Sequence, residues 1–409
     1  MIELRKISLG LFAVALVLGA AGRAKAEERL TLVFVGDTGT NASGAPVSAK
    51  GGYKAGQLRS VDRALLRVTP WLKSDVTFAN LESVVTTSNA LPPRAKMFTF
   101  RMHPAGARAL VDAGVNVFST ANNHAMDFGG RGAGETLKNM ESLKAHGLYA
   151  APGLGRTEVE ALTPQTFEVK DIRVAISAFG LGGGGLPAKP GEAGTLRGDT
   201  GLKRLVSRLE ATDADLRILS VHYGREFAPR VMPADVVRFR EALASTDGVS
   251  VIVGHHPHVA RGVELSGQHL ILYGMGNFMH FGTQNMAHFD ICRDFGLLAR
   301  VGLLRGGDGA MKIETVEAVP LTMMHRQTRP MTGKAAALRL DVLNYLGHLL
   351  DAEKGPARGL RFAQQADGSG LWCAAGATDV RCAGWKMPSL STGNEATQIA
   401  AACARNVHR

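Results

Sequence analysis

Five short polar motifs carry the residue types that metal and acid–base chemistry requires, and each of them follows a run of apolar residues. The apolar runs are residues 32–35, 76–79, 115–118, 216–219 and 251–253. The motifs that follow them are residues 36–37, 80–82, 122–127, 222–226 and 254–258. Ligands of open α/β sheets bind beyond the carboxyl ends of the strands. If the runs are strands, the polar side chains therefore meet at one edge of the fold.

Carboxylate, amide and imidazole groups together form the ligand set of one or two divalent metal ions. The motifs predict a divalent metal as cofactor, with Mn, Fe, Zn and Mg all compatible. His255 is an alternative to His256 within the histidine-rich turn. The side chains that we expect to bind the metal are Asp37, Glu82, Asn123, His222, His256 and His258.

Two further residues of the third motif are candidates for catalysis. His124 follows the expected ligand Asn123, so its ring is placed to act as a general acid beside the metal. Asp127 lies three residues later and can accept a hydrogen bond from a histidine ring, which would fix its tautomer. The sequence thus predicts His124 and Asp127 as the catalytic residues.

Composition describes an ordinary globular protein with a basic surface. Of 409 residues, 45% are hydrophobic and 20% charged, and the net charge is +11. This charge suits anionic polymers or lipid headgroups as partners. We expect no nucleic acid, because no basic run is interleaved with aromatic residues. The glycine-rich stretch 180–201 follows a strand-like run but lacks Gly-Lys-Ser/Thr, so we expect a surface loop rather than a phosphate-binding loop.

The first 26 residues have the pattern of a signal peptide. Arg5 and Lys6 precede an apolar run over residues 7–21, and Ala24-Lys25-Ala26 fits a cleavage site. We expect a mature protein that begins near Glu27, with export to the periplasm or cell envelope. An uncleaved N-terminal anchor is the alternative.

The four cysteines fit an oxidising compartment, where disulfides form. Cys373 and Cys382 are the preferred pair because they close a small loop. The sequence leaves open whether Cys292 and Cys403 are free.

Strand-like runs alternate with amphipathic stretches from about residue 29 to residue 330, which predicts an α/β fold with parallel strand pairs. Residues 27–330 are therefore expected to form the main domain, and residues 331–409 a C-terminal helix followed by a cysteine-containing tail. Helices are expected over residues 60–72, 104–113, 135–146, 202–209, 234–244 and 334–350.

The series of motifs resembles the CapA family of capsule-synthesis and poly-γ-glutamate-biosynthesis proteins, within the calcineurin-like metallophosphatase superfamily. The resemblance covers about residues 30–330. It implies an α/β/β/α sandwich of two mixed sheets flanked by helices, with a metal site at one edge. The matching stretches are GD at 36–37, NLE at 80–82, FR at 100–101, ANNHAMDFG at 121–129, HYGREF at 222–227, GHHPHV at 254–259 and YGMGNF at 273–278.

Two positions depart from the superfamily pattern. Gly39 stands where the first motif, Asp-x-His, has its histidine, and Glu82 stands where the second motif has Asp. The missing histidine favours a non-catalytic accessory subunit of an envelope polymer synthase. The complete histidine motifs favour a metal-dependent hydrolase.

Three functions follow from these considerations. The first is an exported CapA-like protein of capsule or poly-γ-glutamate biosynthesis, with metal-dependent hydrolase activity, whose partners are the anionic polymer and a membrane synthase complex. The second is the accessory subunit without turnover. The third is a periplasmic phosphomonoesterase or nucleotidase, which should show aromatic residues in its substrate pocket, whereas only 6% of this chain is aromatic.

Overall fold

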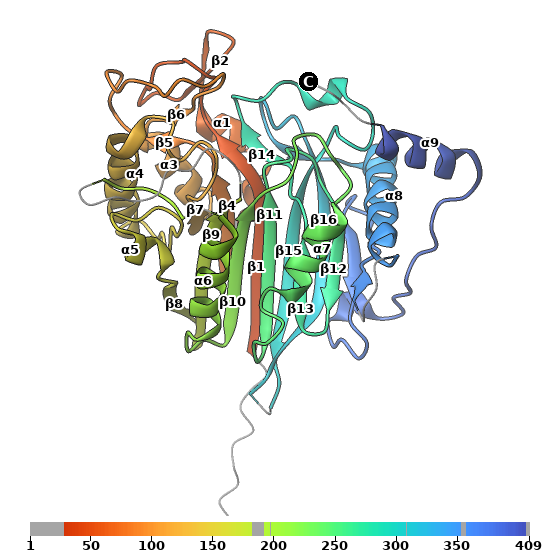
Figure 1. The fold of residues 1–409 in the computed structure, drawn as a ribbon. Coiled ribbons are helices and arrows are strands. Elements are labelled where there is room, and N and C mark those ends of the chain that lie inside the picture. The colour runs from red at the N-terminus through yellow and green to blue at the C-terminus, as the bar shows by residue number, and fades with distance from the viewer. Residues whose placement is uncertain (1–27, 182–191, 197, 308, 353–356, 406–409) are drawn as a thin grey trace, which may run out of the picture.

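The computed structural model describes residues 28–181, 192–196, 198–307, 309–352 and 357–405. The expected signal peptide (1–26) and the four glycines at 182–185 lie outside the described residues. Within the described part, two large sheets pack face to face and helices cover their outer faces (Figure 1). This arrangement confirms the predicted sandwich of two mixed sheets flanked by helices.

The first sheet is built around β1, which runs toward the upper end of Figure 1. Its strand order is β19-β20-β16-β15-β1-β4-β7, with β14 beside β1 and β17 beside β16. β1 is parallel to β4 and β14 and antiparallel to β15. The strands are β1 (Glu28–Gly39), β4 (Val76–Leu81), β7 (Val117–Ser119), β14 (Asn277–His280), β15 (Gly296–Arg305), β16 (Met311–Thr322), β17 (Arg329–Pro330), β19 (Ala363–Gln364) and β20 (Gly370–Cys373).

The second sheet has the order β18-β12-β13-β11-β10-β9-β8, and β9, β10, β11 and β13 are parallel neighbours at its centre. All five apolar runs before the polar motifs thus overlap strands. The strands of this sheet are β8 (Gln165–Val169), β9 (Ile172–Gly180), β10 (Leu216–His222), β11 (Val249–His255), β12 (Val263–Ser266), β13 (His269–Leu272) and β18 (Arg358–Gly359). Two small ribbons pair β2 (Gly52–Lys54) with β3 (Gln57–Arg59) and β5 (Val84–Val85) with β6 (Arg101–Met102).

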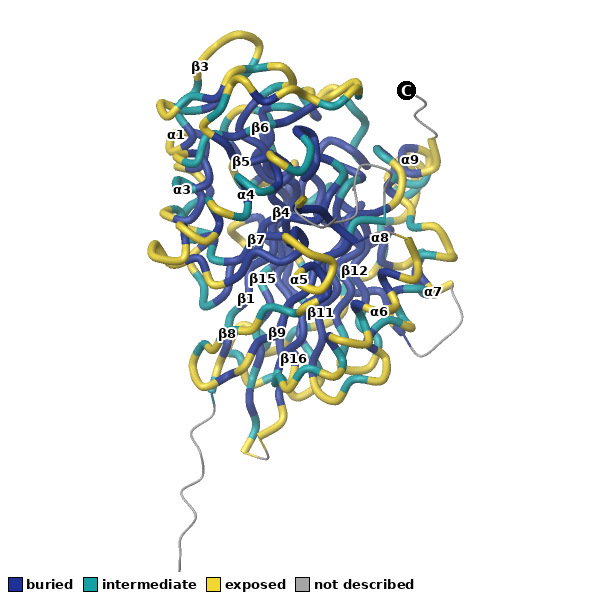
Figure 2. The backbone as a smooth tube through the Cα atoms, turned by 60° about the vertical axis from the view of Figure 1, so that its left-hand side comes forward, coloured by how far each residue is buried: buried dark blue, intermediate teal, exposed yellow. Residues whose placement is uncertain are grey.

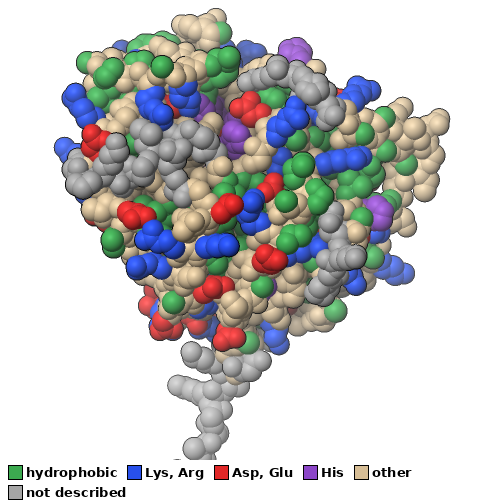
Figure 3. Space-filling model, viewed as in Figure 1, with side chains coloured by type: hydrophobic (Ala, Val, Ile, Leu, Met, Phe, Trp, Pro, Cys, Tyr) green, Lys and Arg blue, Asp and Glu red, His purple; other side chains and the backbone are tan. Residues whose placement is uncertain are grey.

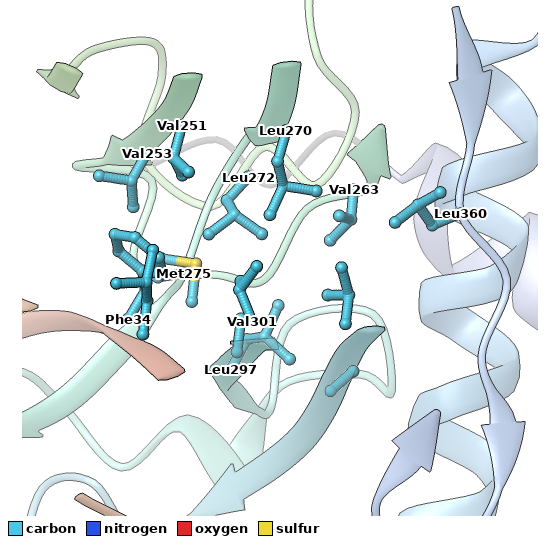
Figure 4. Packing of buried hydrophobic residues seen from close by; sticks show 14 of the residues in the cluster. Phe34, Val251, Val253, Val263, Leu270, Leu272, Met275, Leu297, Val301 and Leu360 are labelled. Carbon is cyan, nitrogen blue, oxygen red and sulfur yellow. The ribbon is translucent and has the colours of Figure 1, made fainter. Parts of the chain in front are cut away.

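Alternation along β1 separates the two sides of the first sheet. Leu32 and Phe34 belong to the core between the sheets, whereas Val33 and Val35 pack toward the outer helices, because successive side chains of a strand point to opposite faces. Phe34 lies beside Val253 of the second sheet in the inter-sheet core (Figure 4). Figure 2 shows the strands buried along most of their length, as expected for sheets covered on both faces.

Helices form the outer layers. Those against the first sheet are α1 (Val61–Leu65), α2 (Thr69–Leu72), α3 (Pro104–Asp112) and α4 (Gly129–Lys144), and those against the second are α6 (Gly198–Glu210) and α7 (Pro233–Glu241), with α5 (Glu158–Leu162) beside α6. Among the described residues, no helix has both the length and the apolar character needed to cross a bilayer.

The single helix expected over residues 60–72 is wrong, because the structure has two short helices there. Pro70 lies in the first turn of α2. Proline lacks the N–H group that a continuous helix would need, and its ring clashes with the carbonyl of the residue four positions earlier. The interruption at residues 66–68 follows from that one residue.

The C-terminal region contributes to both sheets. α8 (Gly333–Leu350) packs against β12 and β18 of the second sheet and against β16 of the first. β18 extends the second sheet, and β19 and β20 extend the first. The division at residue 330 stays a prediction, although the helix expected at 334–350 is confirmed. Cys373–Cys382 is bridged as predicted, and a second disulfide joins Cys292 to Cys403 at the end of α9 (Gly393–Ala404).

Candidate metal centre

The two sheets deliver the polar motifs to the same end of the sandwich. Asp37 near the end of β1 is in register with Asn80 of β4, and His222 at the end of β10 is in register with His255 of β11. Figure 3 shows histidine side chains at a hollow in the upper part of this face. Parallel strands therefore place donors of two separate sheets at one edge, as the sequence predicted.

Two groups of side chains have the spacing of metal ligands. Within each group, one donor atom of every residue lies within 4.8 Å of the others. The first group is Glu82, His222 and His256, and the second is Asp37, Glu82 and His258. Asn123 joins the first group, because its Oδ1 lies 2.8 Å from His222 Nε2. All six side chains predicted as ligands thus lie together, with Glu82 common to both groups.

The donor set fits one or two divalent cations. Both oxygens of Glu82 are buried without a hydrogen-bond partner among the described residues, and so is His256 Nδ1. Buried polar atoms are normally satisfied, so such a concentration in one place needs an explanation. A cation bound by these oxygen and nitrogen atoms would satisfy all three.

The turn after β11 holds its histidines in an unusual backbone conformation. His256 has φ +95° and His258 has φ +59°, values that cost residues with a side chain about 1–3 kcal/mol each. Such strain persists only where the surroundings enforce it, and it is concentrated at functional sites. His255, the alternative ligand, instead lies at the end of β11 with Nδ1 3.4 Å from Asp37 Oδ1. The geometry favours His256.

A close approach between two strands fixes the position of Asp37. The backbone N–H of Asp37 donates to Gly276 O at 2.9 Å, and a Cβ added at Gly36 would lie 1.9 Å from that oxygen. The absence of a side chain at Gly36 thus permits this backbone–backbone contact.

The two buried carboxylates have opposite protonation tendencies. Burial raises the pKa of Glu82 well above its ordinary value, and the neighbouring Asp37 charge raises it further. Burial would also raise the pKa of Asp37, but hydrogen bonds and charge from His255 and His258 bring it well below the ordinary value. Because burial and the Asp37 charge disfavour the ionised form of Glu82, a bound cation would stabilise that ionised form.

The histidines divide in the same way. Burial lowers the pKa of His256 to about 4, aided by the charge of His258, and burial together with His256 lowers the pKa of His222 well below the ordinary value. Burial also acts to lower the pKa of His258, but Glu82 and Asp37 raise it to about 9. His222 and His256 are therefore neutral at pH 7, which is the form that binds metals.

His124 and Asp127 form the hydrogen bond that the sequence suggested. His124 Nδ1 lies 2.7 Å from Asp127 Oδ2, and its Nε2 lies 4.0 Å from Glu82 Oε1. Lys96 Nζ lies 2.7 Å from Asp127 Oδ1, and the backbone N–H of Phe100 donates to Oδ2. Asp127, held in this way, orients the ring so that Nε2 faces the candidate ligands.

A cavity of about 270 Å³ opens beside this centre. Three phenylalanines and the half-buried Lys54 give it an apolar wall and a cation, and His124 and His258 also line it. It is lined by Lys54, Phe98, Phe100, His124, Glu226, Phe227, His258, Gly282, Thr283 and Gln284. Its volume suits one chemical group or a small monomer unit.

Sequence reasoning missed two residues that the structure brings to the centre. Lys96 belongs to an irregular segment with no periodic signal, and His280 lies on β14, three residues after Asn277. Asn277 Oδ1 lies 2.9 Å from His258 Nδ1. The local feature that could have drawn attention to His280 is its place in the strand at the YGMGN turn, although the pairing of that strand with β1 cannot be read from the sequence.

Known proteins with similar sequences are named for capsule or polymer synthesis. The chain is 28% identical to a capsule biosynthesis protein CapA of Bacillus anthracis, over 62% of this chain and 60% of that protein. It is 27% identical to a PGA biosynthesis protein CapA of Bacillus subtilis, over 55% and 59% of the two chains. A probable polyglutamine synthesis accessory protein of Mycobacterium tuberculosis is also 27% identical, over 50% and 55%. The chain thus spans about 55–60% of the length of these relatives.

Solved structures give only distant matches. A phosphatase of Mycoplasma pneumoniae overlaps with a TM-score of 0.40 at 15% identity, covering 72% of this chain and 93% of that one. The calcineurin-like phosphoesterase YfkN of Bacillus subtilis overlaps with a TM-score of 0.39 at 12% identity, covering 72% and 90%. Overlaps at this level carry no functional argument.

Most of the sandwich falls within one sequence family. Residues 31–281 match the family described as bacterial capsule synthesis protein PGA_cap. This segment runs from β1 to just beyond β14 and contains all six expected ligands, His124 and Asp127. The CapA proteins of the two Bacillus species are relatives of this chain. The chain belongs to the PGA_cap family of bacterial capsule synthesis proteins.

Proposed function

We propose that this chain is an exported, metal-dependent hydrolase that acts on an anionic envelope polymer such as poly-γ-glutamate or capsule. The observation that carries the proposal is the convergence of Asp37, Glu82, Asn123 and three histidines on one buried centre beside a cavity. The names of its relatives supply the polymer, and the donor set supplies the hydrolytic chemistry.

The residues divide the chemical work among them. A divalent cation bound by the six side chains would supply Lewis-acid stabilisation of developing negative charge. His124 exchanges a proton at Nε2 with the reacting group, while Asp127 fixes its tautomer through Nδ1. Burial lowers the pKa of His124, so its Nε2 is mainly an acceptor at pH 7 until a substrate brings a proton to it. Lys54 and Lys96 add positive charge near an anionic substrate.

Three features support action in the cell envelope. The N-terminal 26 residues have the signal-peptide pattern, two disulfides fit an oxidising compartment, and removal of the signal leaves a net charge of +8. A polymer with regularly spaced negative charges would be attracted to such a protein. We propose a membrane synthase complex as the further partner.

The experiment combines metal analysis with an activity assay on protein purified from the envelope fraction. Mass spectrometry should find an N-terminus near Glu27, and elemental analysis should find a bound divalent metal. Added Mn²⁺ should then support hydrolysis of poly-γ-glutamate. Bound metal without hydrolysis of polymer or phosphoesters would instead identify an accessory subunit.

One observation favours a phosphomonoesterase as second candidate. Phe98, Phe100 and Phe227 line the cavity together with Lys54, although aromatic residues are scarce in the chain as a whole. An apolar wall with a cation suits a small phosphate monoester that carries an aromatic or sugar group. Faster turnover of p-nitrophenyl phosphate than of polymer, lost in Lys54→Met, would favour this candidate over the first.

A further inference from the structure

His280 occupies space that exists only because residue 39 is glycine. Gly39 at the end of β1 is paired with His280 at the end of β14. A Cβ built on Gly39 would lie 2.9 Å from His280 Cε1 and 3.0 Å from Nε2. Contacts under 3.0 Å force one side to move, so a side chain at position 39 would push against the ring at position 280.

The ring of His280 is fully buried and reaches the carboxylate that the two candidate ligand groups share. His280 Nε2 lies 3.3 Å from Glu82 Oε2. Neither atom has a hydrogen-bond partner among the described residues. The contact is slightly longer than the usual N–H···O range of about 2.7–3.2 Å.

A backbone hydrogen bond decides which ring nitrogen carries the proton. The N–H of Gly282 donates to His280 Nδ1 at 3.1 Å, so Nδ1 offers its lone pair. In a neutral imidazole the other nitrogen then bears the hydrogen. The Nε2–H of His280 therefore faces Glu82, and Nε2 has no lone pair for a metal.

His222 differs from His280 in its place among the candidate ligands. Its Nδ1 lies 3.3 Å from Asn80 Nδ2, a side-chain amide nitrogen that also donates to Asp37 Oδ1 at 2.8 Å. His222 has the spacing of a ligand with Glu82 and His256, and His280 belongs to neither candidate ligand group.

We propose that His280 is a positioning residue that donates its Nε2–H to Glu82, and that the ion position beside Asp37 is consequently the weaker of two. This inference rests on the metal centre of the proposed function. The Asp37 side has three protein ligands, Asp37, Glu82 and His258. The other side has four, namely Glu82, Asn123, His222 and His256. A donor on Oε2 orients the carboxylate that both positions share.

The first test compares His280→Gln, which keeps an N–H donor, with His280→Phe, which keeps a ring but loses the donor. Metal-free mature protein is titrated with Mn²⁺ by calorimetry, and thermal melting verifies folding. Wild-type protein should bind in two steps of unequal affinity. His280→Phe should weaken binding by about 10–100-fold, the usual effect of losing such a partner. His280→Gln should recover most of it, and the exposed control His348→Gln should match wild type.

The second test uses the close contact between positions 39 and 280. Gly39→Ala should weaken Mn²⁺ binding as His280→Phe does, because the new Cβ displaces the ring. In a His280→Ala background the same substitution should have no further effect. Gly39→His combined with His280→Ala should add a ligand on the Asp37 side and tighten the weaker step beyond that of wild type.

Pulsed EPR of bound Mn²⁺ counts the imidazole nitrogens directly and gives the contrary outcome. The proposal expects the same count in wild type and in His280→Gln. Loss of one nitrogen signal together with the weaker ion would make His280 a ligand and overturn the donor role. Equal affinity in all His280 variants would also overturn it. Wild-type protein that binds no Mn²⁺ would refute the proposed function itself, which is a distinguishable result.

Discussion

At the scale of single residues, the centre assigns different tasks to similar side chains. His222 and His256 are neutral and close to Glu82, whereas His124 is held by Asp127 and faces the cavity. Identical imidazoles can therefore serve as ligand or proton carrier according to what binds their second nitrogen.

We expect His222→Ala and His124→Ala to fail in different ways. Removal of His222 should lower metal occupancy, because a ligand is lost and no neighbouring group can replace it. Removal of His124 should leave the metal bound and reduce turnover by roughly 10²–10⁴-fold, the usual contribution of a positioned acid or base. Elemental analysis and an Mn²⁺-supported hydrolysis assay on the same preparations distinguish them. Loss of metal in His124→Ala would contradict the assignment.

Metal affinity should rise with pH. The pKa of His258 is raised to about 9, so this group holds a proton near pH 7 in the metal-free protein, and burial raises the pKa of Glu82 well above its ordinary value, which also favours its protonated form. A metal must displace these protons, whereas His256, with a pKa of about 4, has none to release. Calorimetric Mn²⁺ titrations from pH 6 to pH 9, in buffers of different ionisation enthalpy, should show tighter binding at higher pH and net proton release. Affinity independent of pH would contradict this prediction.

The sequence was sufficient to locate candidate residues at or just after strand ends. It was insufficient to locate residues that the pairing of distant strands brings to the centre. Asp37, His222 and His256 stand at the ends of apolar runs, so a one-dimensional pattern finds them. His280 reaches Glu82 because β14 pairs in parallel with β1, and no local pattern reveals that register. The roles of Asp37, His222 and His256 as metal ligands stay predictions until metal binding is measured.

At the scale of elements, close backbone contact positions the chemistry. β1 carries Asp37, and the backbone N–H of Asp37 donates a hydrogen bond to the Gly276 carbonyl. The same scale explains the error over residues 60–72, where amphipathic spacing continued through Pro70 although the backbone could not. Apolar periodicity reports which face is buried, whereas continuity depends on individual residues such as proline.

We expect Gly36→Ala to damage both stability and metal binding. The new Cβ would lie 1.9 Å from Gly276 O, so β1 or the 274–277 segment must shift, at a cost of roughly 1–3 kcal/mol or more. Urea unfolding and Mn²⁺ titration measure the two effects. Gly134→Ala is the matched control, because it lies in α4 with open space around it and should stabilise by about 0.5–1 kcal/mol. Equal behaviour of the two variants would contradict the prediction.

At the scale of the whole molecule, the C-terminal segment is tied back to the cavity wall. Cys292–Cys403 joins positions 111 residues apart. The neighbouring Arg293 is fully buried and donates to Phe227 O and Ala402 O, both at 2.9 Å. The sequence could suggest the short Cys373–Cys382 loop but not this long-range pair, because spacing alone says nothing about distant chain segments.

The two disulfides should differ in their contribution to stability. In the chain-entropy account, a loop of about 110 residues contributes about 4–5 kcal/mol and one of about 10 residues about 2–3 kcal/mol. Cys292→Ala/Cys403→Ala should therefore lower the free energy of unfolding more than Cys373→Ala/Cys382→Ala does. Denaturant unfolding of both double variants measures the difference. A larger loss from the short loop would contradict the entropic argument.

The candidate ligands come from both layers of the sandwich: Asp37, Glu82 and Asn123 lie at or beyond the ends of strands of the first sheet, and His222, His256 and His258 lie at or beyond the ends of strands of the second. A cation bound by all of them would link the two sheets and oppose their separation on unfolding. Since a ligand that binds only the folded state adds about 2.7 kcal/mol at 100 times its dissociation constant, heat resistance should climb with Mn²⁺ concentration. The melting temperature would then report metal occupancy without any substrate.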